Sequence, residues 1–311
     1  MNIIGPDYLV FGVDDLAACR QYLTDYGLTS VDVTDKGGLF AALDGTGIVL
    51  RDKDDPDLPA PLPTASMLRQ QVYGVVDKSD VKAIAAELGK DRDVRELPDG
   101  AIETTDDIGF ALKFQVTVRR ELEMPAEKIN APGSPAQRQA NELGVSDDLP
   151  AVPRTLSHTV LFVPDIEAAT KFYCERLGFT VTDVLAGTGP FLRPGANDDH
   201  HTLFFIQTPD FMKGIEHFAC HLGGPTELVV AGTRFIKAGY ESFWGPGRHN
   251  FGSNWFWYFN SPLGCHVEYD ADMDKHDDNW TPREAPSGAE ASQNFLLQHR
   301  EKWAPGGDRP Q

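Results

Sequence analysis

The chain contains an internal repeat, and this repeat is the feature that most restricts how it can fold. The stretch from Asp7 to Tyr22 can be laid over the stretch from His158 to Tyr173, and both continue to a glycine followed by an apolar residue. Each copy opens with a short apolar run typical of a buried strand and continues with apolar residues at helical spacing. The repeat predicts two tandem domains built on one plan.

Each copy is expected to contain a strand, then a helix, then further strands. Asp14 and Asp165 follow the first apolar runs and are expected to N-cap the helices, and Gly178 lies where the second helix should end. Runs rich in Val, Phe, Tyr and Trp then follow, separated by Gly, Pro and Asp. They span 38–43, 47–50 and 109–116 in the first copy and 202–207, 217–222, 255–260 and 264–269 in the second. The expected fold class is α+β.

The domain organisation follows from the repeat and from local composition. We expect an N-terminal domain over 1–135, a linker over 136–155, a second domain over 156–275 and a C-terminal extension over 276–311. The linker region is rich in Pro, Ala, Asn and charged residues, as connections often are. One short helix is expected at 294–303.

Composition excludes several classes of function. A net charge of −19 over 311 residues makes nucleic-acid binding improbable, because phosphate contacts need clustered Lys and Arg. No run of about 18 apolar residues is present, so we expect no membrane span and a cytoplasmic protein. The four cysteines show no CxxC spacing, which favours neither a zinc site nor a disulfide framework. We also expect a homo-oligomer.

Three residues of the second copy suggest a metal site. His158, His217 and Glu268 each lie on an expected strand. A lone strand histidine is more often a core residue than a ligand. Two imidazoles and one carboxylate on a rigid sheet are, however, the ligand set of the facial triad, which leaves coordination positions open. The combination therefore predicts a metal centre in the second domain.

The first copy has no second triad. Asp7 aligns with His158, Gln70 or Gln71 with His217, and Lys113 with Glu268. A lysine at the place of a metal carboxylate is what a domain that kept its fold and lost its metal would carry. The asymmetry points to the second copy as the functional one.

An ordered set of residues near the end of the second copy resembles a known family. Gly245–His249, Asn250–Trp257, Tyr258, Ser261–Gly264 and His266–Tyr269 follow the pattern of the type I extradiol dioxygenases of the vicinal oxygen chelate superfamily. The resemblance implies two tandem vicinal-oxygen-chelate domains, each of paired βαβββ modules forming an open barrel-like sheet. In that family the C-terminal domain carries the iron and the N-terminal domain is a degenerate copy.

The resemblance also implies roles for single residues. His158, His217 and Glu268 correspond to ligands of Fe(II), although Mn(II) is compatible with the same set. His201 corresponds to the acid/base histidine, with its neighbour His200 as the competitor, since a one-residue slip reverses the face of a strand. His249 and Tyr258 correspond to the pair that contacts substrate hydroxyl and oxygen. No organic cofactor is implied.

The implied activity is extradiol cleavage of a catecholic ring with O2. Val160 stands where some members that act on acidic catechols carry Asn, and Trp244 and Phe251 are expected near the pocket, so we infer an apolar aromatic substrate. The Trp255–Trp257 run is expected to be sheet core. The alternatives are a glyoxalase-like lyase or isomerase and a non-catalytic aromatic-binding protein of the same fold. Which catechol is cleaved, and on which side, stays open.

Overall fold

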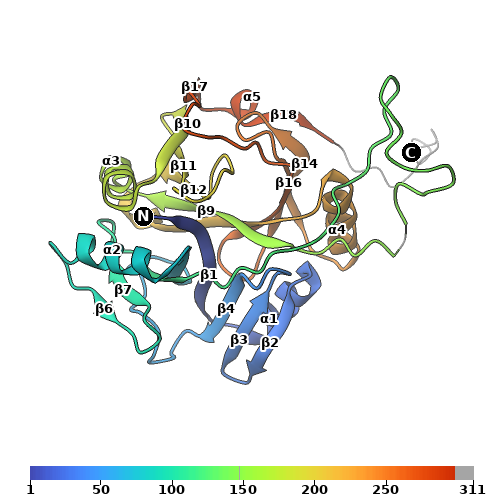
Figure 1. Cartoon of the computed structure of the whole chain (residues 1–311). Helices are drawn as coiled ribbons and strands as arrows, with labels where there is room; N and C mark the ends of the chain where they lie inside the picture. The colour runs from blue at the N-terminus through green and yellow to red at the C-terminus, as the bar shows by residue number, and fades with distance from the viewer. Residues whose placement is uncertain (147, 298–311) are drawn as a thin grey trace, which may run out of the picture.

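The computed structural model describes residues 1–146 and 148–297 and consists of two strongly curved mixed sheets (Figure 1). The first sheet has the order β2-β3-β4-β1-β5-β8-β7-β6. Its strands are β1 (Ile3–Val13), β2 (Thr29–Thr34), β3 (Gly37–Ala41), β4 (Gly47–Asp52), β5 (Leu68–Val75), β6 (Arg95–Glu96), β7 (Ile102–Thr105) and β8 (Ala111–Val116). Helices α1 (Leu16–Tyr26) and α2 (Lys78–Leu88) connect β1 to β2 and β5 to β6.

The second sheet has the order β17-β10-β11-β12-β9-β13-β16-β15-β14-β18. Its strands are β9 (Thr155–Val163), β10 (Thr180–Ala186), β11 (Gly189–Arg193), β12 (Leu203–Gln207), β13 (Gly214–His221), β14 (Ser242–His249), β15 (Trp255–Asn260), β16 (His266–Ala271), β17 (Arg283–Pro286) and β18 (Gln293–Leu296). The helices are α3 (Ile166–Lys171), α4 (Pro225–Lys237) and α5 (Ala289–Ser292), with a π-helical turn at Phe172–Arg176 and a 3₁₀ turn at Asp210–Met212.

The connectivity confirms the expected α+β fold of two tandem domains. Each domain consists of two βαβββ modules, and the first strands of the two modules pair antiparallel, β1 with β5 and β9 with β13. In every module the fourth strand pairs in parallel with the first. The four modules therefore share one strand arrangement. The second sheet thereby surrounds a concave face, visible around the centre of Figure 1.

Strand alternation separates the inner face of the second sheet from its helix-covered outer face. Leu161 and Phe205 belong to the main hydrophobic core, whereas their neighbours Val160 and Phe204 form a separate cluster on the concave side. Trp257 is buried in the core beside Gly232 of α4, where a Cβ atom would lie only 2.1 Å from the indole ring. The expectation that the Trp-rich run is sheet core therefore holds for Trp257. Among the described residues, no helix has the length and apolar character needed to cross a bilayer.

The structure shifts the alignment of the repeat by one residue. The carboxylate of Asp15, not the expected Asp14, caps α1 by accepting from the Ala18 backbone N–H, whereas Asp165 caps α3 as expected. The caps Asp15 and Asp165 are 150 positions apart, but Gly27 and Gly178, which follow the two helical segments with positive φ, are 151 apart. The π-helical turn accommodates the additional residue of the second copy.

Strand pairing identifies the first-domain counterparts of the candidate ligands. The second sheet pairs His158 with Ala219, Ala219 with Glu268, and Val160 with His217. The first sheet has the matching pairs Tyr8 with Val72, Val72 with Lys113, and Val10 with Gln70. Tyr8 rather than Asp7 therefore occupies the position of His158, and Gln70 and Lys113 occupy the other two. None of these three side chains is a typical metal ligand.

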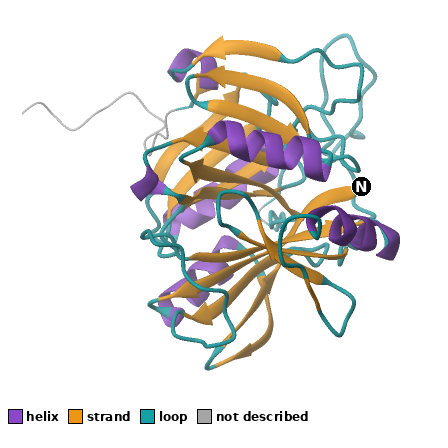
Figure 2. Cartoon of the chain, turned by 90° about the vertical axis from the view of Figure 1, so that its left-hand side faces the viewer, coloured by secondary structure: helices purple, strands orange, loops and turns teal. Residues whose placement is uncertain are grey.

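The C-terminal segment belongs to the second sheet. Strand β17 pairs in parallel with β10 at one edge, and β18 pairs antiparallel with β14 at the opposite edge. The helix expected at 294–303 is wrong for Asn294–Leu296, which lie in β18, and 298–303 lie outside the described residues. Figure 2 shows the two domains one above the other, with helices outside the sheets. Between Val116 and Thr155, the described residues contain neither helix nor strand.

Candidate metal centre

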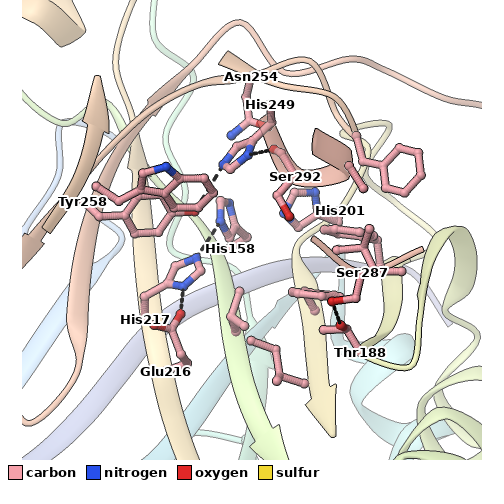
Figure 3. Close-up of a pocket in the computed structure, with 18 of the residues that line it drawn as sticks. His158, Thr188, His201, Glu216, His217, His249, Asn254, Tyr258, Ser287 and Ser292 are labelled. Atoms are coloured by element: carbon pink, nitrogen blue, oxygen red, sulfur yellow. Dashed lines mark hydrogen bonds and ion pairs between the residues drawn. The ribbon is translucent and has the colours of Figure 1, made fainter. Parts of the chain in front are cut away.

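Three adjacent strands bring His158, His217 and Glu268 together. These residues lie on β9, β13 and β16, and one potential ligand atom from each falls within 4.8 Å of the other two. The Nε2 atoms of His158 and His217 are 3.3 Å apart and lie 3.0 and 3.2 Å from Oε2 of Glu268. All three side chains are buried, and His158 and His217 line one end of a cavity (Figure 3).

The partners of each imidazole Nδ1 determine which nitrogen is available to a metal. Nδ1 of His158 lies 3.0 Å from Oγ of Ser157 and 3.3 Å from a carboxylate oxygen of Asp270. Nδ1 of His217 contacts the carboxylate of Glu216. Because ionised carboxylates only accept hydrogen bonds, both Nδ1 atoms carry a proton, so each ring in its neutral, metal-binding form offers the lone pair of Nε2. These lone pairs point toward Glu268.

The donor set fits a cation. Glu268 is fully buried, yet neither of its carboxylate oxygens has a hydrogen-bond donor among the described residues. Burial disfavours a charged His217 ring, but Glu216 and Glu268 outweigh it and raise the pKa of His217 to about 9. Two neutral imidazoles and one carboxylate would satisfy the charge and the lone pairs through a divalent metal, with further positions open toward the cavity.

A second layer of polar residues supports His158 and was not found in the sequence. Asp270 forms an ion pair with His221, with 2.7 Å between Nδ1 and Oδ1, and Ser157 donates a hydrogen bond to Oδ2 of Asp270 at 2.9 Å. Asp270 and Asp199 raise the pKa of His221 to about 10 against the effect of burial. The signal was present, because Asp270 lies two residues beyond Glu268 and His221 four beyond His217. Period-two alternation therefore places them on the faces of the ligands.

The cavity has a volume of about 260 Å³ and two chemically different ends. The polar end is lined by His158, His217, His201, His249 and Tyr258, and Glu268 lies against the two candidate histidine ligands. The other end is apolar and is lined by Val160, Leu185, Phe191, Phe204, Ile206 and Phe251. Trp244, which also lines the cavity as expected, stacks on Tyr258 with ring centroids 5.1 Å apart. Such a site suits a flat, mostly apolar molecule with polar groups at one end.

His249 and Tyr258 form a hydrogen-bonded pair beside Glu268. Nδ1 of His249 donates to the backbone carbonyl of Ser292 at 2.7 Å, so Nε2 accepts from the Tyr258 hydroxyl at 3.2 Å. Tyr258 lies opposite Glu268 in the β15–β16 pairing. Burial, reinforced by Glu268, raises the pKa of Tyr258 well above its ordinary value. The phenol therefore stays protonated.

His201 lines the cavity, whereas its neighbour His200 lies behind it. The centroids of the His201 and His158 rings are 4.4 Å apart, and Nδ1 of His201 is 2.9 Å from Nδ1 of His200. Nε2 of His200 is 2.9 Å from Asp183. Burial lowers the pKa of both histidines, that of His201 well below its ordinary value with added repulsion from His158, so both rings are neutral.

The C-terminal segment contributes to the wall of the cavity. Ser287, Ala291 and Ser292 lie between β17 and β18 and line the apolar side and the His249 side (Figure 3). Since β17 and β18 pair at opposite edges of the sheet, this segment bridges the open side of the curved sheet.

The sequence is similar to a known protein family and to known proteins. Residues 155–269 match the Glyoxalase/Bleomycin resistance protein/Dioxygenase superfamily. Metapyrocatechase 2 of Cupriavidus necator is 34% identical over 150 residues, which cover 48% of this chain and 45% of that protein. Biphenyl-2,3-diol 1,2-dioxygenase of Paraburkholderia xenovorans (strain LB400) is 29% identical over 297 residues, covering 90% of this chain and 91% of that protein.

The fold is also that of a solved structure, the Mn(II)-bound glyoxalase from Novosphingobium aromaticivorans. The TM-score is 0.73 at 22% identity, over 94% of this chain and 91% of that one. The matched region, residues 155–269, contains all three candidate ligands and the residues His201, His249 and Tyr258. Residues 155–269 of this chain, which carry the candidate site, therefore have the sequence pattern of the Glyoxalase/Bleomycin resistance protein/Dioxygenase superfamily.

Proposed function

We propose that this protein is an extradiol dioxygenase, which opens a catecholic ring beside its two hydroxyl groups with O2. The observation that carries the proposal is the buried carboxylate of Glu268, which lacks a hydrogen-bond donor among the described residues and faces two imidazole lone pairs at the end of an aromatic-lined cavity. The two relatives named above, a metapyrocatechase and a biphenyl-diol dioxygenase, support the reaction class.

The metal that we propose is Fe(II), held by His158, His217 and Glu268. Two histidines and one carboxylate with open positions are the ligand set of non-haem iron oxygenases, and Mn(II) suits the same ligands. When bound, the metal would supply positions at which catechol oxygens and O2 meet, and it would lower the pKa of a catechol hydroxyl.

The proposed roles of the other residues follow from their protons. His201 is neutral and buried, so its Nε2 atom can take the proton of a substrate hydroxyl and return it later. The Tyr258 hydroxyl, with its proton directed at His249, can orient a substrate oxygen beside Glu268. The apolar end of the cavity favours an uncharged ring substituent over a carboxylate, because none of its lining residues offers a positive charge.

Oxygen uptake tests the proposed reaction. The protein is loaded with Fe(II) without air and mixed with air-saturated catechol, 3-methylcatechol, biphenyl-2,3-diol and protocatechuate. We expect one O2 consumed for each catechol, a yellow ring-opened product, and the lowest kcat/KM for the acidic protocatechuate. A protein that keeps iron but consumes no oxygen with any of the catechols is not an extradiol dioxygenase. Turnover of a hemithioacetal instead would identify a glyoxalase-like lyase.

Two variants test the division between metal ligands and the acid/base residue. Glu268→Ala removes the only carboxylate of the triad and is expected to abolish iron retention after gel filtration. His201→Ala leaves the triad intact and is expected to retain iron while kcat falls by about 10²- to 10⁴-fold, the usual range for loss of a general acid or base. Iron content and kcat are measured on both. Equal iron loss in the two variants would show that the roles are assigned wrongly.

A further inference from the structure

The adjacent residues His200 and His201 are joined by one hydrogen bond between their rings, beside the cavity. Nδ1 of His200 and Nδ1 of His201 are 2.9 Å apart, with the rings nearly perpendicular at 87°. At this distance one nitrogen must donate and the other must accept. If His201 donates, its Nε2 atom keeps a lone pair, whereas if it accepts, Nε2 carries the proton. The direction of this hydrogen bond therefore decides whether His201 presents a base to the cavity.

Asp183 decides the direction. Its side chain is fully buried and accepts from the backbone N–H of Arg283 at 2.7 Å and from Nη2 of Arg283 at 2.5 Å. Hydrogen bonds from His200 and Arg283 hold the pKa of Asp183 at about 2 despite its burial, so it is ionised and can only accept. The contact with Nε2 of His200 at 2.9 Å therefore places the proton of His200 on Nε2.

The rest of the chain of hydrogen bonds follows from the neutrality of His200. A neutral imidazole has one N–H, and that of His200 is used toward Asp183, so its Nδ1 atom is an acceptor. Nδ1 of His201 must then be the donor. No described residue makes a hydrogen bond to Nε2 of His201, which belongs to a ring that lines the cavity next to His158.

We infer that Arg283, Asp183 and His200 are positioning residues that hold His201 in the Nδ1–H tautomer, so that its Nε2 lone pair faces the substrate cavity. We call this series of hydrogen bonds, Arg283–Asp183–His200–His201, the relay. It begins in the C-terminal segment, because Arg283 is the first residue of β17. The tautomer itself does not depend on the reaction, but its use as a base rests on the proposed dioxygenase function.

A purely structural role for the relay makes a different prediction. Asp183 and Arg283 also lie opposite each other in the β10–β17 pairing, so their ion pair could serve only to fasten the segment. Asp183→Asn separates the two roles, because an amide has the shape of a carboxylate and keeps an oxygen for Arg283. The backbone N–H of Arg283 is fixed in the strand, whereas its side chain is 42% exposed and can move aside. The amide oxygen is therefore expected to face that N–H, with the NH2 facing His200.

In Asp183→Asn, donor and acceptor should exchange places in the hydrogen bonds from residue 183 to His200 and from His200 to His201. The new NH2 group donates to Nε2 of His200, which moves the proton of His200 to Nδ1, and His200 then donates to Nδ1 of His201. His201 is left with its proton on Nε2. An aspartate-to-asparagine change that forces the wrong histidine tautomer is known to cost about 10⁴-fold in kcat in a serine protease.

The test reads the tautomer directly by NMR. Long-range proton–nitrogen correlation spectra of protein labelled with ¹⁵N-histidine distinguish protonated from unprotonated ring nitrogens, in the metal-free and the Zn(II)-loaded protein. His201→Gln assigns the signals. We expect a protonated Nδ1 on His201 in the wild type and a protonated Nε2 in Asp183→Asn. The matched control Asp277→Asn, at an exposed aspartate whose hydrogen bonds go only to Asn279, should keep the wild-type pattern.

Kinetics of the Fe(II)-loaded proteins complete the test. We expect kcat of Asp183→Asn to fall by about 10²- to 10⁴-fold with KM and iron content nearly unchanged. An unchanged His201 tautomer in Asp183→Asn overturns the inference, and so does a reversed tautomer with unchanged kcat. A relay that behaves as expected by NMR in a protein that cleaves no catechol leaves the tautomer assignment standing and refutes the proposed function instead.

A second pair of variants tests the relay even if Asp183→Asn fails to fold. His200→Asn can place an amide oxygen near the position of Nδ1 and accept from His201, whereas His200→Leu cannot. If the relay acts through the tautomer, His200→Asn should retain at least about tenfold more activity than His200→Leu at similar thermal stability. Equal losses in the two variants contradict it.

Discussion

At the scale of single residues, His158, His217 and His201 are each linked through Nδ1 to an acidic group, directly or through another histidine. Asp270 lies behind His158, Glu216 behind His217, and Asp183 behind His201 through His200. A carboxylate at Nδ1 fixes the ring orientation and leaves Nε2 free, which is how second-layer groups tune metal ligands in general. Asp270, Glu216 and Asp183 thus serve to orient histidine rings.

Asp270→Asn should weaken the metal site without removing a ligand. His221 is charged and forms an ion pair with Oδ1 of Asp270, so the amide oxygen is expected to face His221 and the NH2 group to face Ser157 and His158. Nδ1 of His158 then loses its acceptor, and the lone pair on Nε2 is no longer secured. We expect metal affinity to fall by about 10- to 100-fold in chelator competition.

The control for this variant is Asp272→Asn, two residues further along. Asp272 is exposed and pairs only with Arg248, so its replacement should leave metal affinity unchanged. Equal affinities in the two variants would contradict a role of Asp270 in holding His158.

At the scale of elements, the C-terminal segment completes the cavity. Residues 283–296 run from β17 at one edge of the second sheet to β18 at the other, and Figure 1 shows β17, α5 and β18 together along the top of the molecule. Helix α5 has only four residues, so its position depends on the strands at either side rather than on its own stability. The segment supplies Ala291 to the cavity wall and Arg283 to the relay.

Ala291→Phe should narrow the apolar end of the cavity. A phenyl ring at this position projects toward the space next to Phe191 and Phe251, where a ring substituent would lie. We expect kcat/KM for biphenyl-2,3-diol to fall by at least about tenfold, with a smaller effect for unsubstituted catechol. Ala289→Phe, on the exposed side of the same helix, is the control and should change neither value. A uniform loss for both substrates in Ala291→Phe would show that α5 does not form a substituent pocket.

At the scale of the whole molecule, the first domain supports the candidate metal centre of the second. Tyr26 of α1 stacks on Tyr269 with ring centroids 4.2 Å apart. The Tyr26 hydroxyl donates to the backbone carbonyl of Glu268 at 2.5 Å, and the Tyr269 hydroxyl donates to the carbonyl of Tyr26 at 2.7 Å. The backbone of the candidate ligand Glu268 is therefore held from the first domain.

A second contact between the domains gives stability a pH dependence. Asp106 of the first domain is buried and accepts from the Tyr173 hydroxyl of the second at 3.2 Å. Burial raises its pKa from 3.8 to about 6, against the effect of hydrogen bonds from Phe110 and Ile108. A raised carboxyl pKa means that the folded protein binds the proton more tightly than the unfolded chain. This contribution is present below pH 4 and is lost as the pH rises through about 6.

Asp106→Asn should remove that pH dependence. The difference between the two pKa values corresponds to on the order of 3 kcal/mol. Between pH 4 and 7 the free energy of unfolding of the wild type should therefore fall relative to that of Asp106→Asn by up to this amount. Urea unfolding at a series of pH values measures the difference. Parallel pH profiles of the two proteins would show that Asp106 keeps its ordinary pKa.

Local sequence determined the architecture and the residue types of the site. The strand at 255–260, the cap Asp165 and the tandem βαβββ plan depend on neighbouring residues and on a repeat, both of which are readable along the chain. The strand expected at 264–269 begins and ends two residues later, as His266–Ala271. His158, His217 and Glu268 could be named as candidates for the same reason. The segment 294–296 was misassigned as helix because its strand exists only through pairing with β14.

Only the tertiary structure decided which side chains meet. A shift of one residue turns a strand side chain to the opposite face. The sequence therefore left Gln70 and Gln71 open, favoured His201 over His200 only through the resemblance, and wrongly aligned Asp7 instead of Tyr8 with His158. The series of hydrogen bonds from Arg283 to His201 cannot be read from the sequence, because it joins strands distant along the chain, and alternation shows the face of Asp270 and His221 but not that they meet. Periodicity records which residues can share a face, whereas the register between strands determines which of them share a site.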